Sequence, residues 1–129
     1  MVERKLTAIV VDDDIDTVEL FSEYLQLQGI EVLAKGYDGK EAVELYKKLK
    51  PDIAFLDVMM PHYDGTFALT EIKQLKPLAK VIMVTADLTV ETARRLEGLG
   101  ASAVVYKPFE FEEIMSTIYR LIQPNSVTM

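Results

Sequence analysis

The segment that decides the fold reads LTAIVVDDD and occupies positions 6–14. A short run rich in Val and Ile is typical of a buried strand, and here it leads directly into three consecutive carboxylates. Four further runs of this kind lie at 30–33, 53–56, 81–84 and 103–106. The segments between them carry apolar residues at three- to four-residue spacing, which indicates amphipathic helices. The chain therefore predicts a strand followed by a helix, repeated five times.

Local signals mark the ends of the first two predicted helices. Asp14 and Asp16 stand where the first helix begins, and we expect them to cap it. Gly29 follows the last apolar position of that helix and suits its C-terminal end. Asp38 and Glu41 form a capping-box pattern for the second helix, in which Glu41 reaches back to the Asp38 amide.

Strands that alternate with helices need crossover connections, which produce a parallel sheet covered by helices on both faces. The first, third and fourth runs are almost continuously apolar, as expected of central strands. The second run carries Glu31 and Lys35 at its ends and fits an edge of the sheet. We therefore expect an α/β fold, a doubly wound (βα)5 sandwich, in one domain, since 129 residues suit a single domain.

The composition excludes several classes of function. Without cysteine, the chain has no disulfide, thiolate nucleophile or cysteine-ligated metal. His62 is the single histidine, which leaves little room for a histidine-rich metal site. The net charge of −7 argues against binding of nucleic acid through the phosphate backbone. No apolar run approaches the roughly 20 residues of a membrane helix and the N-terminus lacks an apolar signal core, so we expect a cytoplasmic protein with no membrane insertion.

Polar side chains follow four of the five predicted strands, at the edge of a parallel sheet where ligands bind. They are Asp12 and Asp13 after the first run, Asp57 after the third, Thr85 after the fourth and Lys107 after the fifth. Three carboxylates within a few ångströms repel one another, and without a cation one pKa must rise sharply. A divalent cation resolves this conflict. An all-oxygen ligand set favours Mg²⁺, which takes one or two carboxylates and keeps several waters.

These residues lie within five motifs that together resemble the response-regulator receiver domain, the CheY-like family of two-component signal transduction. The motifs are IVVDDD at 9–14, IAFLDVMMP at 53–61, DG at 64–65, VTA at 84–86 and KPF at 107–109. The resemblance covers nearly the whole chain and implies the sheet order 2-1-3-4-5 of flavodoxin-like and CheY-like folds. It also implies one receiver domain over residues 1–129, with a core at about 5–123 and no output domain.

The resemblance implies a role for each site residue. Asp57 would be the phosphoacceptor and would receive a phosphoryl group from a kinase phosphohistidine. Asp12 and Asp13 would hold Mg²⁺ together with Asp57 and the main-chain carbonyl of Met59. Lys107 and the metal would neutralise charge on the transferring phosphoryl group. The implied function is a phosphorylation-activated signalling switch, which catalyses only its own aspartyl phosphorylation and dephosphorylation.

The resemblance also implies a switch, in which Thr85 donates its hydroxyl to the phosphoryl group and Ala86 offers its backbone N–H. The Lys107–Pro108 bond would be cis. The family usually has an aromatic residue three positions before the lysine, and here that position is Val104. Tyr106 shares a strand face with Val104 because side chains alternate along a strand. Either Tyr106 takes over the coupling or the coupling proceeds without an aromatic residue.

The partners implied by the resemblance are a sensor histidine kinase or a phosphotransfer protein, and a downstream protein target that the sequence does not identify. We expect a monomer or weak dimer that signals through altered protein–protein contacts. Because the chain starts at Met1 with a coherent first strand, we favour a stand-alone regulator. A receiver excised from a larger regulator and a phosphorelay intermediate are the alternatives.

Two further interpretations of the acidic motif are weaker. Four acids match positions 1, 3, 5 and 12 of an EF-hand loop, namely Asp12, Asp14, Asp16 and Glu23. However, Thr17 stands where that loop needs glycine, and a strand precedes it instead of a helix. The DIDTV stretch at 14–18 also resembles the nucleophile motif of haloacid-dehalogenase-type phosphatases. In that family a second acidic motif follows the lysine, whereas Asp57 precedes Lys107.

Overall fold

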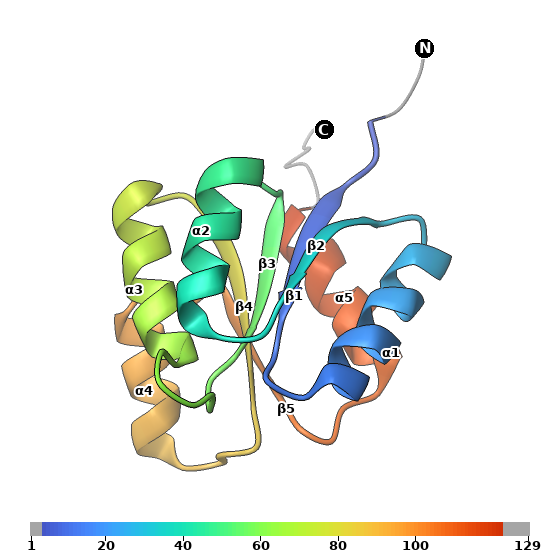
Figure 1. Cartoon of the computed structure of the whole chain (residues 1–129). Helices are drawn as coiled ribbons and strands as arrows, with labels where there is room; N and C mark the ends of the chain where they lie inside the picture. Colours follow the sequence, from blue (N-terminus) through green and yellow to red (C-terminus); the bar gives the residue numbers. More distant parts are fainter. Residues whose placement is uncertain (1–3, 123–129) are drawn as a thin grey trace, which may run out of the picture.

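The computed structural model describes residues 4–122 and shows a five-stranded sheet with helices on both faces (Figure 1). The strands are β1 (Thr7–Val11), β2 (Glu31–Gly36), β3 (Ile53–Asp57), β4 (Lys80–Thr85) and β5 (Ala103–Tyr106). The helices are α1 (Ile15–Leu27), α2 (Gly39–Leu49), α3 (Gly65–Leu75), α4 (Val90–Gly98) and α5 (Phe111–Ile122). The strand order is β2-β1-β3-β4-β5 and every neighbouring pair is parallel. The predicted doubly wound (βα)5 fold and its strand order are confirmed.

The two faces of the sheet bury separate apolar clusters. Helices α2, α3 and α4 cover one face, and α1 and α5 cover the other (Figure 1). Because successive side chains of a strand point to opposite faces, Ile9 and Val11 join the first cluster while Ala8 and Val10 join the second. Strands β1, β3 and β4 are buried almost throughout, which explains their continuous apolar runs. None of the helices within residues 4–122 is both long and apolar enough to span a membrane.

Three strands extend beyond their apolar runs at the carboxyl end of the sheet. β2 continues through Lys35 to Gly36, because β1 pairs with both residues. β3 and β4 include Asp57 and Thr85, two polar residues that lie outside the apolar runs. Ladder pairing with the neighbouring strands therefore holds these two residues in place.

Helix α1 begins at the predicted place, but its cap differs from the prediction. Asp14 is the N-cap residue by position, yet its carboxylate accepts a hydrogen bond from the Thr17 hydroxyl and not from a backbone N–H. Asp16 is exposed in the first turn, where its charge faces the positive end of the helix dipole. Gly29 has a φ of +86°, the left-handed conformation that suits a helix end.

The capping box of α2 is shifted by one residue from the prediction. Asp38 accepts from the Glu41 N–H at 2.8 Å, as expected of the N-cap. The Glu41 carboxylate, however, accepts from the N–H of Tyr37 at 2.7 Å instead of the predicted Asp38 amide. The chain enters the helix in an extended conformation at Asp38, and in this geometry the Tyr37 N–H lies within reach of Glu41.

A polar cluster fixes the start of β1 against the start of β3. The Asp52 carboxylate accepts from two guanidinium nitrogens of Arg4 at 3.0 Å, and from the N–H and hydroxyl of Thr7 at 2.8 and 3.0 Å. The Asp52 N–H donates in turn to the Thr7 hydroxyl at 3.0 Å. Although burial alone would raise the pKa of Asp52, these donors lower it, so the carboxylate stays charged. The cluster joins two neighbouring strands at the end of the sheet opposite to the carboxyl edge.

Asp52→Ala should lower the free energy of unfolding by about 1–3 kcal/mol, because it leaves the partly buried Thr7 N–H without its partner. Urea unfolding followed by circular dichroism measures this change. Glu44→Ala, which removes an exposed carboxylate from α2, is the control and should change stability by less than about 0.5 kcal/mol. Equal stability of the Asp52 variant and the wild type would contradict the role given to this cluster.

Candidate functional site

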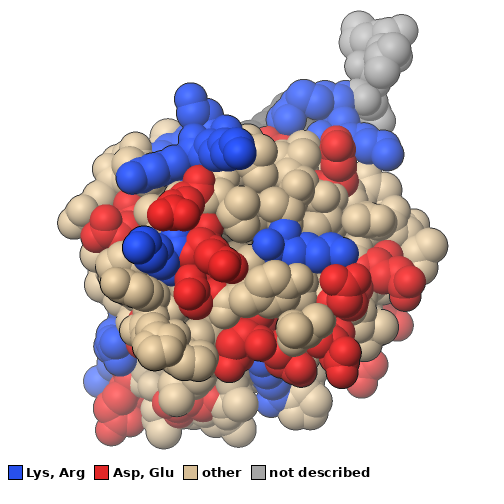
Figure 2. Space-filling model, in the orientation of Figure 1, with Lys and Arg blue, Asp and Glu red and all other residues tan. Residues whose placement is uncertain are grey.

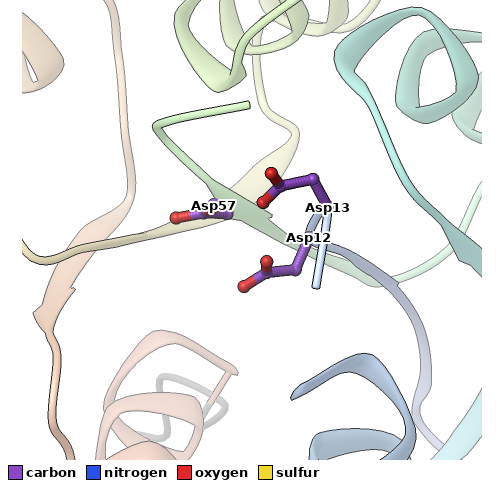
Figure 3. Close-up of side chains that lie close together, drawn as sticks. All are labelled: Asp12, Asp13 and Asp57. Atoms are coloured by element: carbon purple, nitrogen blue, oxygen red, sulfur yellow. The ribbon is translucent and has the colours of Figure 1, made fainter. Parts of the chain in front are cut away.

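Three carboxylates meet at the carboxyl edge of the sheet (Figure 3). Asp12 and Asp13 follow β1, and Asp57 ends the adjacent strand β3. One carboxylate oxygen from each residue lies within 4.8 Å of the others. Asp12 and Asp57 are only 5% and 6% exposed, whereas Asp13 is exposed to solvent. The predicted meeting of these three side chains is confirmed.

The carboxylates lie at the end of the molecule at which the strands finish. On the face shown in Figure 2, acidic side chains gather over the lower part, while lysine and arginine gather mainly along the upper edge. The lower part corresponds to the end of Figure 1 at which the strands finish. On this face, the end of the molecule at which the strands finish is therefore the more acidic one.

Lys107 brings positive charge to the cluster from the end of β5, the edge strand of the sheet. It follows β5, which is separated from β1 by β3 and β4. Its Nζ lies 2.9 Å from Oδ2 of Asp12 and 3.4 Å from Oδ1 of Asp57. Its backbone N–H donates to the Thr85 carbonyl at 2.8 Å, and the Lys107–Pro108 peptide is cis, as the sequence implied. The lysine thus contacts two of the three carboxylates.

One ammonium does not neutralise three carboxylates. Burial and then the charge of Asp12 raise the pKa of Asp57 to about 6, against the lowering effect of Lys107. Although burial lowers the pKa of Lys107, the bond to Asp12 and the charges of Asp12 and Asp57 raise it on balance. Both shifts reflect burial combined with excess negative charge. Carboxylate oxygens without sulfur or imidazole donors are the ligands that suit Mg²⁺, so the cluster fits that ion.

The backbone after β3 is packed closely against the site. Gly65 begins α3, and a Cβ at this position would overlap the main-chain oxygen of Asp57. Its N–H donates to the Val58 carbonyl at 2.9 Å, which holds the loop in place. Met59 lies between them with its side chain 68% exposed. Among the hydrogen bonds of residues 4–122, none is accepted by the Met59 carbonyl.

The remaining predicted residues lie at the ends of β4 and β5. Thr85 is fully buried, and Ala86, the next residue, is exposed. Tyr106 pairs with Thr85 across the β4–β5 ladder and is partly buried. Val104 packs against the apolar cluster on the face that α2, α3 and α4 cover. The ladder therefore places the aromatic residue Tyr106 beside Thr85.

Asp87 is a polar residue near the site that the sequence analysis missed. Its N–H donates to the Thr85 hydroxyl oxygen at 3.0 Å, and its carboxylate accepts from the Thr89 N–H at 2.9 Å and from the Thr92 hydroxyl at 2.6 Å. The available signal was an acid directly between a strand-end threonine and a helix-capping threonine. The VTA motif at 84–86 ends one residue before Asp87.

The structure contradicts the EF-hand interpretation of the first acidic motif. Asp16 and Glu23 lie within α1, so the stretch is helical where an EF-hand needs a calcium-binding loop. Asp14, the nucleophile in the phosphatase interpretation, bonds to the Thr17 hydroxyl and is not part of the three-carboxylate cluster.

Comparisons with known proteins agree with this geometry. The model of the response regulator receiver domain matches residues 8–119. The chain is 32% identical over 114 residues to the chemotaxis protein CheY of Bacillus subtilis (strain 168), covering 88% of this chain and 95% of CheY. It is also 32% identical over 126 residues to the probable C4-dicarboxylate response regulator DctR of Priestia megaterium, covering 95% of this chain and 55% of DctR. A chain of the CheX-CheY-BeF3-Mg+2 complex from Borrelia burgdorferi matches with a TM-score of 0.86 and 27% identity, over 90% of this chain and 88% of that one.

The fold and the acidic site thus define a CheY-like signalling domain. The chain belongs to the response regulator receiver domain family, whose members are phosphorylation-activated switches of two-component systems. It spans about half the length of DctR and 26% of the regulatory protein AtoC of Escherichia coli (strain K12). The resemblance inferred from the sequence motifs is confirmed.

Asp57→Asn should raise the free energy of unfolding of the metal-free protein at pH 7 by about 1–2 kcal/mol. The folded pKa of about 6 exceeds the ordinary value of 3.8, so ionising Asp57 costs more in the folded than in the unfolded chain. The contribution of Asp57 to the free energy of unfolding of the wild type is therefore fully present below about pH 4. It is lost as the pH rises through 6. Urea unfolding in EDTA across this range should show the advantage of the variant growing with pH.

Glu44→Gln, which neutralises an exposed carboxylate on α2, is the matched control and should show no such growth. An Asp57→Asn advantage that is constant with pH would contradict the assigned cause.

Proposed function

We propose that Asp57 is the phosphoacceptor of this receiver domain. The observation that carries the proposal is the convergence of Asp12, Asp13 and the Lys107 ammonium on its carboxylate at the end of β3. An oxygen of Asp57 attacks the phosphorus of a phosphohistidine, so that a P–O bond forms. The P–N bond breaks, and its electron pair stays with the imidazole nitrogen. Because the phosphoryl group ends on the chain itself, the protein acts only on its own aspartate.

Mg²⁺ is the cofactor proposed for this site. Asp12, Asp13 and Asp57 would hold it, together with the main-chain carbonyl of Met59. When bound, the ion supplies the positive charge that the oxygens of a transferring phosphoryl group require. The all-oxygen donors and the raised pKa of Asp57 support this assignment.

Three further residues are proposed to bind the phosphoryl group. Lys107 bonds to Asp12 at 2.9 Å and lies 3.4 Å from Asp57, so its ammonium is already positioned beside the acceptor oxygen. Thr85 retains a hydroxyl proton for donation, because its oxygen is the acceptor in its bond with the Asp87 N–H. Ala86 would offer its backbone N–H, and its small side chain leaves the approach to Asp57 open.

The proposed partners are a sensor histidine kinase or a phosphotransfer protein, and a protein target that responds to the phosphorylated state. The match over 95% of the length of CheY supports a stand-alone regulator. The match over 55% of DctR supports the alternative, a receiver within a larger regulator. The same site residues would also serve a phosphorelay intermediate. Signalling through altered protein contacts by a monomer or weak dimer is part of the proposal.

Acetyl phosphate with Mg²⁺ should add one phosphoryl group to the wild-type protein, and intact mass spectrometry detects the addition. Asp57→Asn should abolish labelling because it removes the attacking oxygen. Lys107→Ala should retain some labelling, because Lys107 contributes charge and not a bond. Excess EDTA removes Mg²⁺ and should therefore suppress labelling of the wild type. Without the ion, the Lys107 ammonium alone offsets the repulsion between the three carboxylates and the incoming phosphoryl group.

Asp14→Asn is the matched control, since this neighbouring carboxylate bonds to Thr17 outside the cluster, and it should label like the wild type. Labelling of Asp57→Asn equal to that of the wild type would rule out the assignment. Labelling that proceeds equally well in EDTA would rule out the metal.

Tyr106 is proposed to carry part of the coupling from the site, because it pairs with Thr85 across the ladder. Tyr106→Ala should reduce the amide NMR shifts that beryllofluoride with Mg²⁺ causes in α4. We expect the coupling free energy that Tyr106 carries to lie within about 1–3 kcal/mol. Thr85→Ala should quench them. If Thr85→Ala quenches the α4 shifts while Tyr106→Ala leaves them intact, Tyr106 has only a structural role.

A further inference from the structure

Asp87 lies between the site threonine and helix α4 and is bonded to both. Its backbone N–H donates to the Thr85 hydroxyl oxygen, and its carboxylate accepts from the Thr89 N–H and the Thr92 hydroxyl. Thr89 is the N-cap of α4, and Thr92 lies in the first turn of the helix. These donors lower the pKa of Asp87, so the carboxylate is ionised and its bonds are charge-assisted. One residue thus joins the site to the start of the helix.

Helix α4 is held to the protein by little apolar contact. Of its nine residues, Leu96 alone is buried. A second polar link runs from Arg95 to the Thr66 hydroxyl at 3.1 Å, and Thr66 donates to Asp64, the cap of α3. An element with so little buried apolar area is easily displaced, because few contacts oppose the movement. The polar links of α4 therefore have a large share in fixing its position.

The described residues offer no other side-chain hydrogen bond to Thr85. Tyr106 pairs with Thr85 in the ladder, and Val104 packs in the apolar cluster. Among the hydrogen bonds of residues 4–122, neither Tyr106 nor Val104 donates to or accepts from the Thr85 hydroxyl. Within this part of the chain, the hydrogen-bonded route from Thr85 to α4 runs through Asp87.

We propose that Asp87 is a positioning residue that couples the Thr85 hydroxyl to helix α4. The inference rests on the proposed phosphorylation of Asp57. When the Thr85 hydroxyl turns to donate to a phosphoryl oxygen, its oxygen moves relative to the Asp87 N–H. All three hydrogen bonds of Asp87 are kept when the loop between β4 and α4 moves together with Thr85. That movement displaces Thr89 and Thr92, because both are bonded to the Asp87 carboxylate. The first turn of α4 therefore moves with the site threonine.

The test uses the whole chain, labelled with ¹⁵N and titrated with beryllofluoride and Mg²⁺. The amides of Val58 and Met59 report binding at the site, and the amides of residues 90–98 report the response of α4. In Thr92→Val, the α4 shifts should fall at least about twofold relative to the site shifts, because the hydroxyl that bonds Asp87 is gone. Thr92→Ser restores the hydroxyl and should restore the ratio. A merely structural Thr92 would change the melting temperature without changing this ratio.

Thr117→Val is the matched control, since the Thr117 hydroxyl donates to the Glu113 carbonyl within α5, which covers the opposite face of the sheet from α4. Its ratio should equal that of the wild type. Asp87→Ala removes both carboxylate contacts but keeps the N–H, and it should reproduce the loss seen in Thr92→Val. If Asp87→Ala does not fold, the comparison of Thr92→Val with Thr92→Ser decides.

A wild-type α4 response retained in Thr92→Val would overturn the inference. So would a wild-type protein in which the site amides respond and the α4 amides do not. A wild type whose Val58 and Met59 amides ignore beryllofluoride would instead contradict the proposed phosphorylation of Asp57, and with it the coupling that depends on it.

Discussion

The Lys107 ammonium lies 2.9 Å from Asp12 and 3.4 Å from Asp57, and this contact partly offsets the charge of three clustered carboxylates, of which two are buried. Its single charge leaves the cluster negative, and burial together with the charge of Asp12 raises the pKa of Asp57 to about 6. Charges held together at a cost to stability are typical of functional sites. The unneutralised charge supports the proposed Mg²⁺ site, at which the ion would offset the charge of an incoming phosphoryl group.

The sheet topology makes this contact possible. β1 and β3 are neighbours, so Asp12 and Asp57 meet as a direct consequence of parallel pairing. Lys107 comes from β5, two strands beyond β3, and it returns to the cluster along the carboxyl edge. Because every strand is parallel, all of these ends lie at one edge, and the opposite edge is free for structural contacts such as the Asp52 cluster.

The packing of the helices divides the molecule into firm and loosely held parts. Asp57 and Thr85 lie within buried strands, and Asp12 and Asp13 directly follow another, so the ladder pairing of β1, β3 and β4 positions the site. Helix α4 buries only Leu96 and depends on polar contacts through Thr92 and Arg95. Elements with few buried contacts are those that move at low free-energy cost, which suits α4 to a part in signalling. The Asp87 bonds lie at the junction of these two parts.

Much of this arrangement could be predicted from the sequence, because hydrophobic periodicity and strand ends are local properties. The runs at 6–11 and 53–56 predicted central strands, and the acids after them predicted the cluster of Asp12, Asp13 and Asp57. The residue after the fifth run predicted the lysine, and the family resemblance added the strand order. The shift of the α2 capping box to Tyr37 and the bond of Asp14 to Thr17 were beyond prediction, because they depend on the angle at which the chain enters each helix.

Tertiary structure alone determined the pKa of Asp57, the reach of Lys107 and the three bonds of Asp87. Each depends on distances of a few ångströms between groups far apart in the sequence or on the path of a loop. Composition and spacing do not encode such distances, since a shift of one ångström leaves the sequence pattern intact but decides whether a hydrogen bond exists.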